Sequence, residues 1–211
     1  MTEPEAVQPE KRMTFPNPML VVVSGPSGVG KSTIVAELAR RRPQVVPIVT
    51  ATTRPQREDE IDGVHYHFMS EEAFRALIER EGLLEHANNH GAWYGTPVDQ
   101  VRGILAAGRD AILTISPEGA RNVRRLVPDA LLIFVMPPTM EALAERLRAR
   151  GSESEASLAR RRRDAERWIA ESHDYDHVVV NETGHPEAAA DDIWEIIQAE
   201  ARRDPPRRPR V

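Results

Sequence analysis

Residues 25–33 read G-P-S-G-V-G-K-S-T and combine three glycines, one lysine and three hydroxyl side chains. The spacing Gly25-x4-Gly30-Lys31-Ser32 fits a phosphate-binding loop. Glycines let the backbone turn tightly and approach an anion closely, so that successive N–H groups point into one concavity. Lys31 can then reach the outer phosphates of a nucleotide, and the Ser32 hydroxyl can bind Mg²⁺. The predicted phosphate-binding residues are Gly25, Pro26, Ser27, Gly28, Val29, Gly30, Lys31, Ser32 and Thr33.

A second group of anion-binding side chains, Arg54, Arg57 and Tyr66, lies within residues 50–68. Arginine side chains hold phosphate oxygens through paired hydrogen bonds, and Pro55 restrains the backbone directly after Arg54. An Arg-x-x-Arg pair by itself is more often solvated surface. Together with the phosphate-binding loop, however, this group suggests a cleft that transfers a group between two phosphorylated molecules.

The segments that must position these residues alternate between strand-like and helix-like patterns. Residues 20–23 form a short apolar run typical of a buried strand, and Ile34, Val35 and Leu38 recur at helical spacing after the loop. Further strand-like runs lie at 45–51, 111–115, 131–135 and 178–180, and helix-like runs at 71–81, 139–150 and 188–201. The alternation predicts an α/β fold with a parallel sheet, helices on both faces, and ligands at the carboxyl ends of the strands.

The composition of the 211 residues narrows the class of protein. A net charge of −5 argues against broad nucleic-acid binding, and the absence of cysteine excludes disulfides and thiolate metal sites. No apolar run approaches 18 residues and no secretory signal is visible, so we expect a cytoplasmic protein without a membrane partner. Residues 1–18 are predicted to be a disordered tail, and residues 201–211 a solvated, basic, proline-rich tail.

Four motifs, in order along the chain, resemble those of the guanylate kinase family. They are G-P-S-G-V-G-K-S-T, T-T-R-P-Q-R-E-D-E-I-D-G-V-H-Y-H-F, L-L-E-H-A and W-Y-G-T-P, and the resemblance extends from about Met19 to Ala201. It implies a P-loop NTPase-type, doubly wound parallel sheet with an inserted nucleoside-monophosphate-binding subdomain and a short lid. The implied domain spans 19–200, with core segments 19–53, 98–145 and 174–200, a GMP-binding insertion at 54–97 and a lid at 146–173.

The resemblance also implies an activity, the Mg²⁺-dependent transfer of the γ-phosphoryl group from ATP to GMP, giving ADP and GDP. ATP would lie on the phosphate-binding loop and beside Asn181, with Mg²⁺ on Ser32. The residues implied in catalysis are Lys31, Arg54, Arg146, Arg150 and Arg161. Phosphoryl transfer depends mainly on charge neutralisation and in-line positioning, which these cations would supply. For the lid arginines, a solvated basic helix paired with neighbouring acids remains the alternative.

For GMP, the residues implied by the resemblance are Thr50, Arg54, Arg57, Glu60, Tyr66, Glu85, Tyr94, Thr96 and Ser116. The two arginines and two tyrosines would hold the phosphate, and Thr50 and Glu85 would recognise guanine. A carboxylate can accept hydrogen bonds from both the N1–H and the exocyclic amine of guanine. Adenine has no such pair of donors, so its binding would leave the acceptor unpaired.

The chain departs from the family pattern at residues 114–118, where the family commonly has two acids followed by Gln-Gly. Thr114 and Ser116 replace the two acids, and Glu118 replaces the glutamine. A neutral hydroxyl is a weaker partner than a carboxylate, so we expect weaker GMP binding. Trp168 stands where the family often has a glutamate, and the sequence offers no explanation of it.

Two alternatives to the kinase remain open at this point. One is a guanylate-kinase-like module with weakened catalysis that binds a phosphorylated ligand. The other is a P-loop kinase with a different phosphorylated acceptor. Metal binding by histidine is not expected, because His65 and His67 lack further ligands and because Asn88, Asn89 and Gly91 favour a loop near His86.

Overall fold

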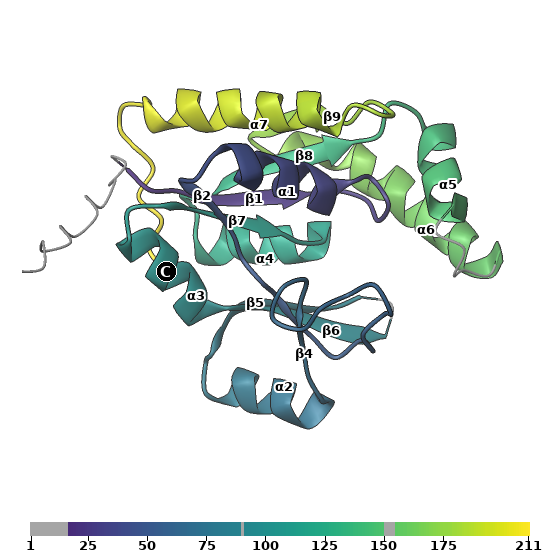
Figure 1. Ribbon diagram of the computed structural model, residues 1–211, viewed down its shortest axis with the longest axis horizontal. Helices are drawn as coiled ribbons and strands as arrows, with labels where there is room; N and C mark the ends of the chain where they lie inside the picture. The colour runs from purple at the N-terminus through teal and green to yellow at the C-terminus, as the bar shows by residue number, and fades with distance from the viewer. Residues whose placement is uncertain (1–16, 90, 150–154) are drawn as a thin grey trace, which may run out of the picture.

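Figure 1 shows a computed structural model of the chain, which describes residues 17–89, 91–149 and 155–211. Its five-stranded core sheet has the order β2-β7-β1-β8-β9, and every neighbouring pair of strands is parallel. The strands are β1 (Leu20–Ser24), β2 (Val45–Pro47), β7 (Asp110–Thr114), β8 (Leu131–Met136) and β9 (His177–Val180). The predicted α/β fold with a parallel sheet is therefore confirmed.

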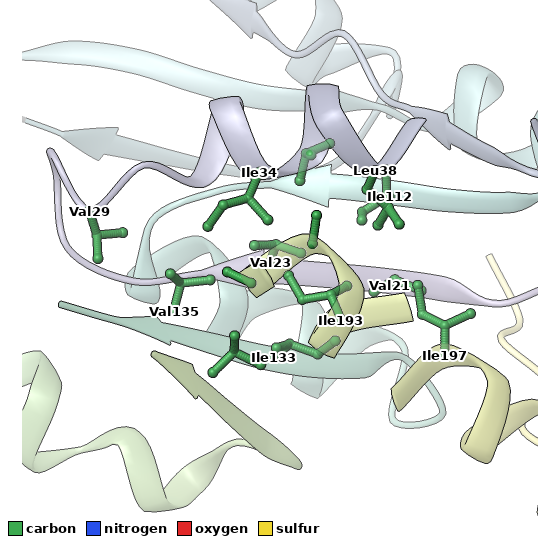
Figure 2. Packing of buried hydrophobic residues seen from close by; sticks show 14 of the residues in the cluster. Val21, Val23, Val29, Ile34, Leu38, Ile112, Ile133, Val135, Ile193 and Ile197 are labelled. Carbon is green, nitrogen blue, oxygen red and sulfur yellow. The ribbon is translucent and has the colours of Figure 1, made fainter. Parts of the chain in front are cut away.

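The two faces of the core sheet bury alternate side chains of β1, because successive residues of a strand point to opposite sides. Val21 and Val23 belong to an apolar cluster that includes residues of α1 and α7, as Figure 2 shows. Leu20 and Val22 belong to a second cluster with residues of α3 and α4. The four helices are α1 (Lys31–Arg41), α3 (Val98–Ala106), α4 (Pro117–Leu126) and α7 (Pro186–Ala201). Helices thus cover both faces, and β1 is buried along its whole length.

A second sheet, with the order β4-β3-β6-β5, is inserted into the core and lies to one side of it in Figure 1. Its elements are β3 (Ala51–Thr52), β4 (His67–Phe68), α2 (Glu71–Glu79), β5 (Leu83–Asn89) and β6 (Ala92–Pro97). Helix α2 begins after Ser70, whose hydroxyl accepts a hydrogen bond from the Ala73 N–H and so satisfies one free backbone donor. The buried ring of Phe74 stacks on Trp93 and joins α2 to the sheet.

Two further helices, α5 (Met140–Ala149) and α6 (Glu155–Ala170), lie at one end of the core and are followed by the short helix η1 (Ser172–Asp174). Both helices present an apolar face to the core, with Leu143, Leu147 and Ala165 buried there. Among the described helices, none has the length and apolar character needed to cross a membrane.

One predicted strand, residues 45–51, is wrong as a single element, because the chain changes sheets within it. After β2, the Ile48 N–H still donates to the Ile112 carbonyl of the core sheet, at 2.9 Å. The next N–H, that of Val49, donates instead to the Gln100 side chain at 2.7 Å. The chain then enters β3 of the second sheet. Apolar character runs through both strands, and so the sequence pattern could not reveal the boundary between them.

The loop expected at Asn88 and Asn89 is also wrong, because both residues end strand β5. They pair with Trp93 and Ala92 across a hairpin, which satisfies their backbone groups although their side chains are polar. The neighbouring strand β4 begins at His67, and His65 lies in a turn where its Nδ1 accepts from the Ile61 N–H. The prediction of a loop relied on the polar side chains of Asn88 and Asn89, whereas the strand depends on pairing with β6, which the local sequence does not specify.

The C-terminal residues 201–211 differ from the solvated tail that their charge suggested. Arg207 is buried, and its Nε donates to Glu200 at 2.6 Å while its Nη1 donates to the Ala130 carbonyl at 3.1 Å. Its Nη2 also lies 3.5 Å from an Asp176 oxygen. The Val211 side chain packs against the second apolar cluster. The segment is therefore part of the fold, because a single arginine finds three oxygen partners from separate elements.

We expect Arg207→Ala to lower the free energy of unfolding by about 2–4 kcal/mol, because it leaves buried acceptors with fewer partners. Chemical denaturation followed by circular dichroism measures this change. Arg208 is exposed in the same segment, so Arg208→Ala is the matched control and should change stability by less than about 0.5 kcal/mol. Equal effects of the two substitutions would contradict a specific role for Arg207.

Candidate active site

A cavity of about 350 Å³ lies where the phosphate-binding loop faces the second sheet. The predicted residues that line it are Gly25, Ser27, Gly28, Gly30, Lys31, Ser32, Thr33, Thr50, Arg54, Arg57, Glu60, Tyr66, Glu85, Tyr94, Ser116 and Arg161. The structure thus brings together residues as far apart in the sequence as Gly25 and Arg161. Both groups of anion-binding side chains face the same space.

The phosphate-binding loop connects β1 to α1 and depends on glycine at two close approaches. Gly25 has a φ of 143°, and a Cβ there would lie 2.3 Å from the Val135 carbonyl oxygen. Gly30 has a φ of 101°, and a Cβ there would lie 2.4 Å from the Asn181 amide nitrogen. Any side chain at either position would collide with a fixed group and would need a strained backbone. The loop can therefore close tightly at the N-terminus of α1, where backbone N–H groups favour an anion.

Lys31 folds over the loop in this structure. Its Nζ donates to the carbonyl of Gly25 at 2.7 Å and to that of Pro26 at 2.9 Å. These bonds hold the ammonium group beside the cavity, at the place where the outer phosphates of a nucleotide would approach. The role of Lys31 in phosphate binding stays a prediction.

Several predicted residues support the loop instead of lining the cavity. Asn181 is buried at the end of β9 and donates through Nδ2 to the Val29 carbonyl at 2.7 Å. Arg146 donates to the Val29 carbonyl at 3.1 Å and to the Asn181 carbonyl at 2.9 Å. Pro26 and Val29 are themselves buried. Roles of these residues in contact with ATP stay predictions, and the predicted catalytic residue Arg150 lies outside the described residues.

Helix α6 contributes Arg161 to the cavity wall from the opposite side of the loop. Its Nη1 donates to the Ser27 hydroxyl at 2.6 Å, so α6 and the phosphate-binding loop are in direct contact. Trp168, about two turns further along the same helix, also lines the cavity and is buried. The sequence signalled Trp168 only as a departure from the family pattern.

The second anion-binding group is ordered around an ion pair between Arg54 and Glu60. Arg54 Nη2 donates to both carboxylate oxygens of Glu60, at 2.6 and 2.8 Å. Although burial opposes it, hydrogen bonds from the Arg54 side chain and the Arg57 backbone lower the pKa of Glu60. The Arg54 guanidinium also lies over the Tyr66 ring, and the Tyr66 and Tyr94 rings are in edge contact. Because the guanidinium also lies over the Phe68 ring, one acid and two aromatic rings hold Arg54 in place.

Glu85 is the buried acid of the cavity, with 5% of its surface exposed. It lies on β5, and its Oε1 accepts a hydrogen bond from the Thr96 hydroxyl on β6 at 2.7 Å. Burial raises the pKa of Glu85 to about 7, although the bond from Thr96 opposes the shift. The predicted role of Thr96 is therefore indirect in this structure, because Thr96 orients Glu85 and does not line the cavity.

The residues at the end of β7 show how the missing acids are replaced. Ser116 is the N-cap of α4, and its hydroxyl oxygen accepts from the Gly119 N–H at 3.3 Å. Asn89 Nδ2 donates to the same oxygen at 3.2 Å. Glu118 is exposed and does not line the cavity, so it does not take the place of the lost acids. Sequence reasoning missed Asn89, and only its position four residues after Glu85 on one strand could have indicated that both face the cavity.

The hydroxyl side chains at the cavity are suitable ligands for a magnesium ion. The Ser32 hydroxyl lines the cavity directly after Lys31, and the Thr114 hydroxyl lines it at the end of β7. Mg²⁺ is commonly held by one or two protein oxygens together with substrate phosphates, so these hydroxyls suit an ion carried by a nucleotide. Within the described ranges, no group of three or more histidine, aspartate or glutamate side chains is placed to hold a metal by itself.

A parallel core sheet that carries a phosphate-binding loop, facing an inserted sheet and a helical lid, defines the P-loop class of nucleoside monophosphate kinases. Comparison with known proteins narrows this class. A family model described as guanylate kinase matches residues 17–200. The chain belongs to the guanylate kinase family.

Individual relatives agree with this assignment. The guanylate kinase of Symbiobacterium thermophilum is 47% identical over 167 residues, which cover 79% of each chain. That of Desulfitobacterium hafniense is 44% identical over 182 residues, which cover 86% of this chain and 90% of the relative. The crystal structure of guanylate kinase from Anaplasma phagocytophilum matches with a TM-score of 0.72 and 30% identity, over 90% of both chains. The family suggested by the four sequence motifs is confirmed.

Proposed function

We propose that the chain is an ATP:GMP phosphotransferase in which the two walls of the cavity hold one nucleotide each. The observation that carries this proposal is a single space lined by Lys31 on one wall and by Arg54 and Glu85 on the other. An oxygen of the GMP phosphate would attack the γ-phosphorus of ATP, and the bond to the β-phosphate oxygen would break to release ADP. Magnesium, carried by the nucleotide and Ser32, would neutralise charge on the β- and γ-phosphates.

On the donor wall, the loop N–H groups and Lys31 would bind the phosphates of ATP. Lys31 must exchange its carbonyl partners for phosphate oxygens, which are stronger partners because the hydrogen bond is then assisted by charge on both sides. Arg161 would approach the transferred group from the lid, and Arg146 and Arg150 are proposed to act with it. Closure of the lid over ATP would exclude water from the reacting phosphate.

On the acceptor wall, Arg54, Arg57, Tyr66 and Tyr94 would hold the GMP phosphate. Glu60 fixes Arg54 and would keep its charge in place when the phosphate arrives. Glu85 and Thr50 would bind the guanine edge, with Thr96 holding the carboxylate of Glu85. A buried carboxylate without a matching donor is costly, so AMP is expected to be rejected.

A coupled assay of ADP production with GMP, dGMP, AMP and UMP tests the function. Activity confined to guanine nucleotides supports the proposal. Retained GMP binding without turnover would instead indicate a phospho-ligand-binding module, and turnover only with another acceptor would indicate a different P-loop kinase. The predicted segment boundaries, which rest on the family resemblance, and the cytoplasmic location stay predictions.

Restoring an acid at the end of β7 should strengthen GMP binding. We expect Ser116→Asp to lower KM for GMP about fivefold, because one carboxylate oxygen can cap α4 while the other gives guanine an additional charged acceptor, worth roughly 1 kcal/mol. Aspartate is also a good N-cap, so α4 should keep its first turn. Ser116→Asn is the matched control, since it keeps the cap without the charge. An unchanged or raised KM in the aspartate variant would refute the prediction, as would an equal gain in the asparagine variant.

A further inference from the structure

Asn89 lies at the end of β5 and lines the cavity on the same strand as Glu85. Its partner across the hairpin is Ala92, whose short side chain leaves room beside the amide. The Asn89 Nδ2 donates to the Ser116 oxygen at 3.2 Å. The amide oxygen accepts no hydrogen bond from any residue in 17–89, 91–149 or 155–211. One end of the Asn89 amide is therefore fixed, and the other is available to a ligand.

Ser116 itself cannot accept a hydrogen bond from a ligand in this arrangement. A hydroxyl oxygen has two acceptor positions. The Gly119 N–H occupies one at 3.3 Å, and the Asn89 Nδ2 occupies the other. Only the hydroxyl hydrogen remains, so Ser116 can donate to a ligand but cannot receive its N–H groups.

Glu85 and Asn89 are joined along the cavity wall by the start of α4. A Cβ at Gly119 would lie 3.0 Å from Glu85 Oε2, so the Glu85 carboxylate rests against Gly119. Gly119 donates to Ser116, and Ser116 accepts from Asn89. The carboxylate and the amide oxygen are thus two acceptors on one continuous surface.

We propose that Asn89 is a specificity-determining residue that accepts a hydrogen bond from the exocyclic amine of guanine. The inference rests on the proposed function and deepens it. The guanine edge presents three N–H groups, one on N1 and two on the amine. Glu85 has acceptor positions for the N1–H and one amine hydrogen, and the Asn89 oxygen receives the second amine hydrogen. The Asn89 amide thereby assumes an acceptor role that Ser116 cannot perform.

Comparison of GMP with inosine monophosphate tests this role, because the inosine base lacks only the exocyclic amine. For Asn89→Leu, we expect kcat/KM for GMP to fall about fivefold to tenfold. The value for inosine monophosphate should stay the same, so the ratio between the two substrates falls by the same factor. Asn89→Asp keeps an acceptor oxygen and is expected to retain the preference for GMP.

Binding of both monophosphates without ATP, measured by titration calorimetry, separates this proposal from the function. A wild-type chain that binds GMP more tightly than inosine monophosphate but has no turnover would overturn the kinase function. A loss of affinity for GMP alone in Asn89→Leu would then still support the role of Asn89. Equal losses for the two ligands in Asn89→Leu would show that Asn89 only supports the fold. No loss for GMP in a variant with wild-type thermal unfolding would also overturn the proposal.

Discussion

Lys31→Ala should lower kcat by a factor on the order of 10³, because it removes the cation that we propose faces the transferred phosphoryl group. The Nζ lies against two loop carbonyls at 2.7 and 2.9 Å, at the point where the loop opens to the cavity. In the proposed function, GMP binds to the opposite wall through Arg54 and its neighbours, so its affinity should change little. Steady-state kinetics gives kcat, and titration of GMP in the absence of ATP gives the affinity.

Lys31→Arg provides the matched control for this experiment. It keeps the positive charge but presents it on a longer, planar group that cannot occupy the same position between two carbonyls. We expect it to retain ATP binding better than the alanine variant and still to lose most turnover. Loss of both turnover and GMP affinity in a folded Lys31→Ala protein would contradict the division of the cavity into two walls.

Glu85→Gln should reduce kcat/KM for GMP by about 10²-fold, since one acceptor becomes a donor that faces the donors of guanine. The wild-type affinity should also depend on pH, because the pKa of Glu85 is about 7 and only its ionised form accepts both hydrogen bonds. Between pH 6 and pH 8 the ionised fraction rises about tenfold, and the affinity for GMP should rise with it. The glutamine variant should lack this dependence beyond what the GMP phosphate itself contributes.

The same substitution should stabilise the folded protein at alkaline pH. Burial raises the pKa of Glu85 from its ordinary 4.5 to about 7, so the folded state holds a proton that the unfolded state releases. Stability therefore falls as pH rises from 4.5 to 7, and the cost of about 3 kcal/mol is fully present above pH 7. Glutamine carries no charge and avoids this cost.

Urea denaturation at pH 8 and at pH 4.5 checks the sign of this effect. The gain of Glu85→Gln should be large at pH 8 and should disappear at pH 4.5. Thr96→Val is a useful control, because it removes the hydrogen bond to Glu85 without removing the acid. Equal stability of Glu85→Gln and wild type at pH 8 would show that burial of this acid is not costly.

The sequence predicted those parts of the site that depend on short-range chemistry. Gly25, Gly30 and Lys31 follow one another in a loop whose backbone needs are local, and the structure places them at the cavity. Arg54 and Glu85 required the family resemblance, because a single arginine or acid in a polar segment has no distinctive pattern. Their common cavity wall depends on strand pairing within the inserted sheet, which no local pattern specifies.

Other features depended on contacts between distant residues and could not be predicted. Arg146 and Asn181 looked like ligand-binding residues, yet they hold the Val29 carbonyl from two separate elements. The sequence predicted that Arg207 is solvated, yet Glu200 and the Ala130 carbonyl accept hydrogen bonds from it. Asn89 has no distinctive sequence pattern, and its partner Ser116 at the start of α4 is 27 positions away along the chain. In each case the partner is determined by the tertiary fold.

The inserted sheet is joined to the core at two crossings of the chain, one at residues 48–50 and the other where β6 runs into α3 at Val98. The Val49 N–H of the first crossing donates to Gln100 of the second at 2.7 Å. This bond holds the two attachment points of the inserted sheet side by side. Rotation of the inserted sheet about the line through them would break the bond from Asn89 to Ser116, and sliding along the core would break the bond from Val49 to Gln100.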